Sequence, residues 1–390
     1  MPQDLYQHPD YYQLDDLLSD EHKLIRDTAR AWIKKDVSPI IEDYAQRAEF
    51  PMQIIPGLAD IGAFGPTIPV EYGGGGLDYI SYGILMQELE RCDSGVRSTA
   101  SVQGSLVMFP IYEFGSEEQR KKYLPKMATG EWMGCFGLTE PDFGSNPAGM
   151  VTHFKDAGDH VILNGAKMWI SNSSFAQVAI VWAKDEKGEI HGLIVERGMK
   201  GFTTPETHGK WSLRASATGE LVFDNVKVPK ENLVGVEGNG FLQLMKFLDY
   251  SRVMIAGDGV GLAQGALEQA VNYVKKRKQF GKPLASFQVT QFKIAEMATL
   301  IETARSLTYK ACWNLDRGTV DTQASAKAKW WACNVAVKVV DEALQLHGGY
   351  GYLDDYPIER FYRAAKLLEI YEGTKEIQKM AIGRRILGIG

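Results

Sequence analysis

The spacing of hydrophobic residues divides the chain into a helical first part, a strand-rich middle part and a second helical part. Apolar residues recur every three or four positions over residues 19–37, with Ser19 or Asp20 placed to cap the first turn. Ser116 opens the Ser-x-x-Gln form of a capping box, which predicts another helix start. Four consecutive glycines at residues 73–76 predict a loop. The spacing predicts further helices over residues 52–63, 79–91 and 101–114.

Short runs of β-branched and aromatic residues make up the middle part. The runs typical of strands are residues 160–170, 177–183, 189–195 and 219–228. Residues 185–188 predict a turn between the second and third run. We therefore expect a β domain that closes as a small barrel or as packed sheets, ending at Pro229 and the glycine-rich loop 235–240.

Helical spacing then returns and continues to the end of the chain. Long helices are predicted over residues 241–277, 287–316, 319–346 and 359–387. Antiparallel helices of this length form a four-helix bundle. The pattern predicts an α+β fold of three domains: a helical domain at 1–133, a β domain at 134–240 and a four-helix bundle at 241–390.

Composition excludes several classes of function. The 390 residues carry a formal net charge of −6 and 24% charged residues, which argues against intrinsic disorder and against nucleic acid as the main partner. No apolar run approaches the ~18 residues of a membrane span, so no membrane insertion is expected. The acidic N-terminus lacks the basic segment of a targeting signal. We expect a cytoplasmic protein or the mature form of a mitochondrial matrix protein.

The spacing of the cysteines and glycines bears on two further kinds of site, a metal site and a dinucleotide site. The four cysteines form no C-x-x-C pair and no histidine cluster at metal-binding spacing, so we expect buried thiols, a reducing compartment and no metal. Residues 257–261, Gly-Asp-Gly-Val-Gly, begin like a dinucleotide fingerprint, but Leu262 stands where the third glycine is required and a helical pattern precedes it. A nucleotide would therefore be bound by another architecture.

Four segments carry candidate chemistry, each with an ordinary structural alternative. Residues 275–282 hold five cations, which form either a solvated helix end or a clamp for pyrophosphate. Residues 345–352 are a helix stop or a place of close backbone approach. Residues 136–146 and 169–172 combine aromatic and hydroxyl groups, which suits a flat heteroaromatic ring. Glu372 is either a surface glutamate or a general base whose pKa burial would raise.

Together these segments resemble the acyl-CoA dehydrogenase flavoenzyme family from about residue 18 to residue 388. The motifs that carry the resemblance are Leu138-Thr139-Glu140-Pro141 with Gly144-Ser145, Trp169-Ile170-Ser171-Asn172, Arg277-Lys278-Gln279-Phe280-Gly281 and Tyr371-Glu372-Gly373-Thr374. The family fold has the same order of helical, β and helical domains. The resemblance therefore implies FAD as the cofactor and α,β-dehydrogenation of an acyl-CoA as the reaction.

Within the family, residues 88–103, with 105–108 and 212–219, resemble glutaryl-CoA dehydrogenase. A glutaryl tail ends in a carboxylate and needs a cation, for which Arg97 is the candidate. Glu90 lies seven residues earlier, two helical turns away if the helix continues, and would pair with Arg97. The alternative is a purely structural ion pair.

The resemblance also assigns the chemistry. Glu372 would take the α-proton of the thioester, and the β-hydrogen would pass as hydride to FAD. Some family members carry the base just before an arginine on the first long C-terminal helix; here Ser251 precedes Arg252, so Glu372 has no rival. Members that do not decarboxylate lack the residues corresponding to Glu90 and Tyr371. Their presence predicts release of crotonyl-CoA and CO2.

The other site residues follow from the same resemblance. The residues expected at the glutaryl-CoA site are Arg97, Glu90, Ser98, Ser101, Val102, Ser145, Arg252 and Tyr371. The residues expected to hold FAD are Phe136, Leu138, Thr139, Ser145, Trp169, Ile170, Ser171, Arg277, Gln279, Phe280, Phe287, Gln288, Gln345, Leu346, Gly348, Gly349, Thr374 and Glu376. The ADP half is expected to lie across a subunit boundary of a homotetramer, and electrons are expected to pass to electron-transfer flavoprotein.

Three alternatives stay open at this point. The first is a dehydrogenase of short, branched or longer dicarboxylic acyl-CoA. The second is a flavin oxidase that passes electrons to O2. The third is a non-enzymatic scaffold that binds acyl-CoA or flavin.

Overall fold

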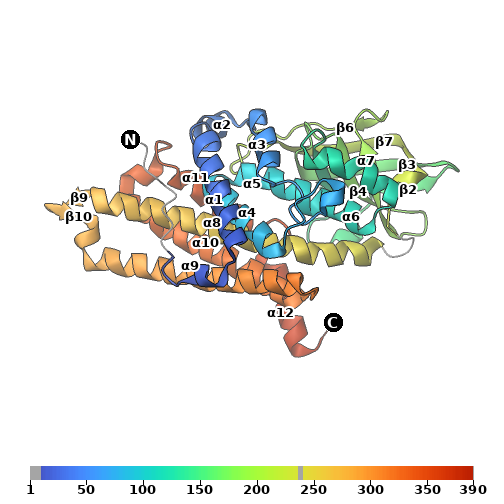
Figure 1. Ribbon diagram of the computed structural model, residues 1–390. Coiled ribbons are helices and arrows are strands. Elements are labelled where there is room, and N and C mark those ends of the chain that lie inside the picture. The colour runs from blue at the N-terminus through green and yellow to red at the C-terminus, as the bar shows by residue number, and fades with distance from the viewer. Residues whose placement is uncertain (1–9, 236–239, 390) are drawn as a thin grey trace.

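The computed structural model describes residues 10–235 and 240–389 (Figure 1). The first part of the chain is helical, as predicted. Its α-helices are α1 (Asp20–Trp32), α2 (Ile41–Arg47), α3 (Ile55–Asp60), α4 (Tyr79–Cys92), α5 (Ser94–Ser101), α6 (Phe109–Phe114) and α7 (Glu117–Ala128). Both predicted capping serines are confirmed: Ser19 accepts from the backbone N–H of His22 at 3.2 Å, and Ser116 accepts from that of Gln119 at 3.2 Å.

The helix predicted over residues 101–114 begins seven residues earlier. Asp93 has extended backbone angles and its carboxylate accepts the N–H groups of Gly95 and Val96, which starts α5 at Ser94. The helix continues through a π-helical stretch, Val102–Met108, into α6. Asp93 also separates α4 from α5, so the helix does not continue from Glu90 to Arg97.

The middle domain is one eight-stranded sheet with the order β6-β7-β3-β2-β4-β5-β8, and β1 pairs with β4 in parallel. The four predicted strands are confirmed as β3, β4, β5 and β7. The strands are β1 (Gly134–Gly137), β2 (His153–Asp156), β3 (His160–Ser171), β4 (Val178–Lys184), β5 (Ile190–Glu196), β6 (Phe202–Thr203), β7 (Thr218–Pro229) and β8 (Leu233–Val234). Most of the predicted loop 235–240 lies outside the described residues.

The C-terminal part is a helical bundle, in which α8 packs against α10 and α9 (Figure 1). The single helix predicted over residues 359–387 is wrong, because the chain breaks at Glu372 and Gly373, whose φ angles of 52° and 88° lie in the left-handed region. The helices are α8 (Gly240–Lys276), α9 (Gln288–Asp316), α10 (Thr322–His347), α11 (Ile358–Leu368) and α12 (Lys375–Leu387). A hairpin of β9 (Lys278–Gln279) and β10 (Lys282–Pro283) joins α8 to α9.

The glycines at 257–261 serve helix packing. A Cβ on Gly261 would lie 2.1 Å from the carbonyl oxygen of Gln87 on α4, and one on Gly259 would lie 2.7 Å from the carbonyl carbon of Ala332 on α10. These glycines therefore let α8 approach α4 and α10 closely, which explains the motif without a dinucleotide.

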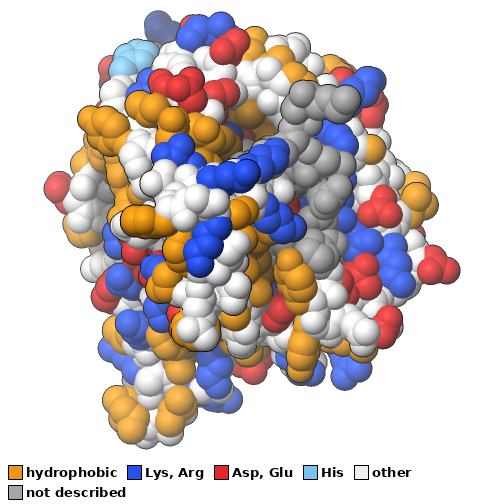
Figure 2. All heavy atoms as spheres, turned by 90° about the vertical axis from the view of Figure 1, so that its left-hand side faces the viewer, with side chains coloured by type: hydrophobic (Ala, Val, Ile, Leu, Met, Phe, Trp, Pro, Cys, Tyr) orange, Lys and Arg blue, Asp and Glu red, His pale blue; other side chains and the backbone are white. Residues whose placement is uncertain are grey.

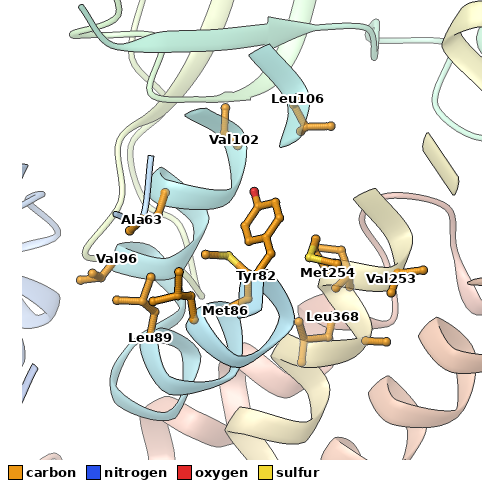
Figure 3. Packing of buried hydrophobic residues seen from close by; sticks show 14 of the residues in the cluster. Ala63, Tyr82, Met86, Leu89, Val96, Val102, Leu106, Val253, Met254 and Leu368 are labelled. Carbon is orange, nitrogen blue, oxygen red and sulfur yellow. The ribbon is translucent and has the colours of Figure 1, made fainter. Parts of the chain in front are cut away.

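A continuous apolar core joins the N-terminal helices to the bundle. Tyr82 and Met86 of α4, Met254 of α8 and Leu368 of α11 are buried together in it, and the hydroxyl of Tyr82 points toward Val102 (Figure 3). The sheet has a second core of its own. All four cysteines are buried thiols, as predicted. Among the described residues, no helix has the length and apolar character needed to cross a bilayer.

Candidate active site

Glu372 lies in the break between α11 and α12. Its carboxylate accepts a hydrogen bond from the hydroxyl of Ser251 on α8. Burial raises the pKa of Glu372, and the Ser251 hydrogen bond and the charges of Arg97, Lys329 and Arg252 limit that rise. Ser251, which stands where some family members carry the base, therefore contacts the predicted base Glu372 in this chain. A carboxylate with a raised pKa is suited to take a proton from a weak carbon acid.

Lys329 of α10 fixes the loop that carries Glu372. Its buried Nζ donates to the backbone oxygen of Tyr371 at 2.9 Å and to that of Gly373 at 2.8 Å, on either side of the glutamate. Sequence reasoning missed this residue. The available signal was a lysine on the face of α10 that also carries the buried residues Ser325, Ala332 and Ala336.

Arg97 is 2% exposed and lies at the centre of a charged cluster. Its Nε is 2.5 Å from Oε2 of Glu90, which is the predicted ion pair, and its Nη2 donates to the hydroxyl of Tyr371. The same Nε is 3.2 Å from Oδ2 of Asp258 on α8. Sequence reasoning considered Asp258 only as part of the rejected glycine motif. The structure thus adds a second carboxylate beside Arg97.

The cluster adjoins the sheet through α5 and β3. Ser98, next to Arg97, has its Oγ 3.5 Å from Oγ of Ser171 at the end of β3. The backbone N–H of Met168 donates to the oxygen of Thr139 at 2.8 Å, so the predicted flavin motifs after β1 and in β3 lie side by side. This junction is where the expected ring-binding residues meet the expected substrate residues.

A buried ion pair holds the segment after β1. Nζ of Lys167 is 2.8 Å from Oε1 of Glu140 and donates to the oxygen of Leu138 at 3.1 Å. Burial lowers the pKa of Lys167 to about 8, and Glu140 opposes this effect. The Leu138–Thr139 backbone is therefore fixed beside β3.

The residues at this junction fit a flat cofactor ring. Trp169 has a φ of 63° and leaves its side chain 60% exposed, which is unusual for so large an apolar group. The hydroxyl of the buried Ser173 has no hydrogen-bond partner among the described residues. The ring of Phe136 packs edge to face against that of Phe247, with 5.6 Å between the ring centroids. The side chain of Ile170 packs in the core of the sheet, and Ser145 is exposed in the loop after β1.

Six residues predicted to hold the ADP half line one hollow of about 510 Å³ at the ends of α8 and α10. They are Arg277, Gln279, Gln345, Leu346, Gly348 and Gly349. The guanidinium of Arg277 lies 5.2 Å from the ring of Tyr350 in the same hollow. Figure 2 shows this end of the molecule, where several Lys and Arg side chains gather. A groove that combines an arginine and two glutamines with tyrosine and leucine side chains suits a pyrophosphate or an adenosine.

The remaining predicted residues are dispersed. Phe280 is 92% exposed at the tip of the β9–β10 hairpin, with its ring 6.2 Å from that of Phe287; Gln288 begins α9. Thr374 caps α12 through its hydroxyl, and Glu376 is exposed in the first turn. The hairpin lies at the opposite end of the molecule from β3 (Figure 1). One chain therefore does not bring its ADP residues to its own ring-binding residues.

This arrangement suits an enzyme that removes a proton from its substrate beside a flat cofactor. Models of the acyl-CoA dehydrogenase N-terminal, middle and C-terminal domains match residues 19–131, 135–226 and 238–387. The chain belongs to the acyl-CoA dehydrogenase family, which is FAD-dependent.

Relatives of known name differ in their acyl group. The chain is 41% identical to a short-chain-specific acyl-CoA dehydrogenase of Clostridium acetobutylicum, over 95% of this chain and 98% of the relative. It is 39% identical to CarC, a subunit of the caffeyl-CoA reductase-Etf complex of Acetobacterium woodii, over 95% and 99%. A glutaryl-CoA dehydrogenase from Mycobacterium smegmatis in complex with FADH2 matches with a TM-score of 0.94 at 37% identity, over 97% of each chain. The comparisons establish the reaction class and leave the acyl chain open.

Replacing Ser251 with Ala will shift the pH dependence of the reaction. The Ser251 hydrogen bond lowers the pKa of Glu372, so its loss raises that pKa further. Because the base acts in its deprotonated form, kcat/KM rises with pH through this pKa, and the acidic limb of the S251A profile will lie at higher pH than that of the wild type. Ser306→Ala on α9, which removes a hydroxyl bonded within its own helix, should leave the limb in place. An unmoved limb in S251A would contradict the assignment of the base.

Proposed function

We propose that this enzyme dehydrogenates glutaryl-CoA and decarboxylates the product to crotonyl-CoA and CO2. The observation that carries the proposal is the buried guanidinium of Arg97, which shares a hydrogen bond with Tyr371, the residue next to the base Glu372. A monocarboxylic acyl tail needs only an apolar pocket end, whereas a tail carboxylate needs a fixed cation. The cluster around Arg97 supports the second case.

The residues of the chain supply the proton chemistry. Glu372 takes the α-proton of the thioester, and Lys329 keeps the loop in position through the two carbonyl groups that flank it. Arg97 and Ser98 orient the acyl tail so that its α-carbon faces Glu372. FAD, when bound against Thr139, Trp169 and Ser171, accepts the two electrons of the oxidation.

Decarboxylation follows from the same arrangement. Loss of the γ-carboxylate as CO2 leaves an electron pair on the γ-carbon, which needs one proton. The carboxyl group of Glu372 holds the proton that it took from the α-carbon and can donate this proton to the γ-carbon. Glu90 pairs with Arg97, which keeps the cation from holding the leaving carboxylate too tightly.

The proposal includes the partners of the reaction. Electron-transfer flavoprotein would reoxidise the flavin, in line with the Etf complex of the related CarC. A homotetramer would bring the 510 Å³ hollow of one subunit to the ring-binding residues of another, since a single chain keeps them at opposite ends. A cytoplasmic location is proposed from the bacterial relatives.

Product analysis tests the proposal. Glutaryl-CoA, enzyme and an electron acceptor should yield CO2 in the headspace and crotonyl-CoA in solution in equal amounts. Chromatography of the thioesters together with headspace gas measurement provides both values. Accumulation of glutaconyl-CoA without CO2 would contradict the decarboxylation step.

A dehydrogenase of short monocarboxylic acyl-CoA is the second candidate. The 41% identity to a short-chain-specific enzyme favours it, as does the neutralisation of Arg97 by the carboxylate of Glu90. It predicts rapid oxidation of butyryl-CoA and little of glutaryl-CoA in the same assay.

A further inference from the structure

Asp258 is a buried acid that the proposed reaction does not use. It lies on α8, is 0% exposed, and faces Arg97 at 3.2 Å. Neither of its carboxyl oxygens accepts a hydrogen bond from any described residue. Burying an ionised carboxylate without hydrogen bonds costs free energy, so we expect Asp258 either to lose its charge or to bind a ligand.

Arg97 faces two carboxyl groups, and one positive charge does not stabilise two buried negative charges. Glu90 accepts hydrogen bonds from Nε of Arg97 and from the hydroxyl of Ser94, whereas Asp258 accepts none. A carboxyl group that accepts no hydrogen bond is the less stabilised in its charged form, so the carboxyl of Asp258 favours a proton. Burial accordingly raises the pKa of Asp258 well above its ordinary value, and Glu90 and Glu372 add to the rise.

A protonated Asp258 is a hydroxyl donor without an acceptor among the described residues. The hydroxyl of Ser101, one helical turn after Arg97, is a second one, because it is also buried without a hydrogen-bond partner among those residues. A group with acceptors only, such as a carboxylate, satisfies donors of this kind. An apolar acyl end would leave them all unpaired.

We propose that Asp258 is a specificity-determining residue, whose neutral carboxyl group donates a hydrogen bond to the terminal carboxylate of the acyl tail beside Arg97. This inference rests on the proposed glutaryl-CoA function and adds a second donor to its carboxylate site. Ionised Asp258 would instead place a negative charge next to the substrate carboxylate and weaken its binding. Binding of a dicarboxylic acyl-CoA therefore weakens as the pH rises, whereas binding of butyryl-CoA does not.

Several charged or titratable groups face Asp258, and their charges also affect the pH dependence of substrate binding. They are Arg97 of α5, Glu90 and Tyr82 of α4, Tyr371 and Glu372 of the loop, and Lys329 and Cys333 of α10. The Glu372→Gln background removes the titration of the base. It also stops turnover, so that dissociation constants can be measured by titration of the flavin spectrum of the holoenzyme.

The test compares Asp258→Asn and Asp258→Leu in the E372Q holoenzyme. Asn keeps a donor without the charge, so the Kd of glutaryl-CoA should stay within about 3-fold and lose its rise at high pH. Leu has no donor, so that Kd should rise about 10-fold or more, while butyryl-CoA changes less than about 3-fold. If D258L does not fold, Asp258→Ala makes the same comparison.

Four outcomes would overturn the inference. If D258N binds glutaryl-CoA about 10-fold more tightly, Asp258 is ionised and repels the tail. Equal losses for both thioesters in D258L would show a structural role. If the E372Q parent itself binds glutaryl-CoA no better than butyryl-CoA, the proposed function fails and the inference fails with it. If the parent prefers glutaryl-CoA and D258L keeps the same preference, only the inference is overturned.

Discussion

Replacing Glu372 with Gln will lower the rate of flavin reduction by acyl-CoA by about 1000-fold or more, because it removes the carboxylate that takes the α-proton in the proposed reaction. The amide keeps the shape of the side chain and can still accept from Ser251. FAD content and acyl-CoA binding should therefore be retained. Stopped-flow measurement of the flavin absorbance under anaerobic conditions gives the rate.

An exposed glutamate supplies the control for this variant. Glu186 lies in the turn between β4 and β5, so E186Q changes the same functional group far along the chain from the loop of Glu372. Its reduction rate should equal that of the wild type. If E372Q reduces its flavin at the wild-type rate, the base is another residue.

Replacing Arg97 with Met will separate dicarboxylic from monocarboxylic substrates. The loss of the buried cation leaves the tail carboxylate of glutaryl-CoA without a charged partner, so kcat/KM for glutaryl-CoA should fall about 100-fold or more. Butyryl-CoA has no such carboxylate and should lose less than about 10-fold. Steady-state kinetics with both thioesters measure the ratio.

R97M also leaves Glu90 buried without its partner, which can destabilise the protein by itself. The double variant R97M/E90Q removes both charges and should recover stability while keeping the selective loss for glutaryl-CoA. Thermal unfolding of the single and the double variant separates the two effects. Equal losses for both thioesters in the double variant would make Arg97 a structural residue.

Hydrophobic spacing was enough to locate most helices and strands because they are amphipathic or continuously apolar. The break at Glu372 escaped this reasoning since apolar residues on both sides keep the helical spacing. Helix α11 ends at Leu368, and the left-handed backbone at Glu372 and Gly373 keeps the chain out of a helix until Lys375, which places the predicted base in a loop. Helix α5 escaped it because its Ser-Gly-Thr composition gives no apolar period, although Asp93 was a cap signal.

The site residues divide in the same way. Glu372, Arg97 and Glu90 belong to motifs that can be read along the chain, and the structure brings them together. Lys329 and Asp258 are polar residues on otherwise apolar helix faces, and their partners lie at least 42 residues away in sequence. Their roles depend on how α8 and α10 pack, which local patterns do not specify.

The most direct test of the proposed function is the initial rate of flavin bleaching by a panel of acyl-CoA thioesters under anaerobic conditions. The panel should contain glutaryl-CoA, adipyl-CoA, butyryl-CoA and isovaleryl-CoA at equal concentrations. Admission of air with a peroxide assay then distinguishes a dehydrogenase from an oxidase. We expect glutaryl-CoA to bleach the flavin fastest, with little peroxide on admission of air. Faster bleaching by butyryl-CoA or isovaleryl-CoA than by glutaryl-CoA would contradict the proposed function.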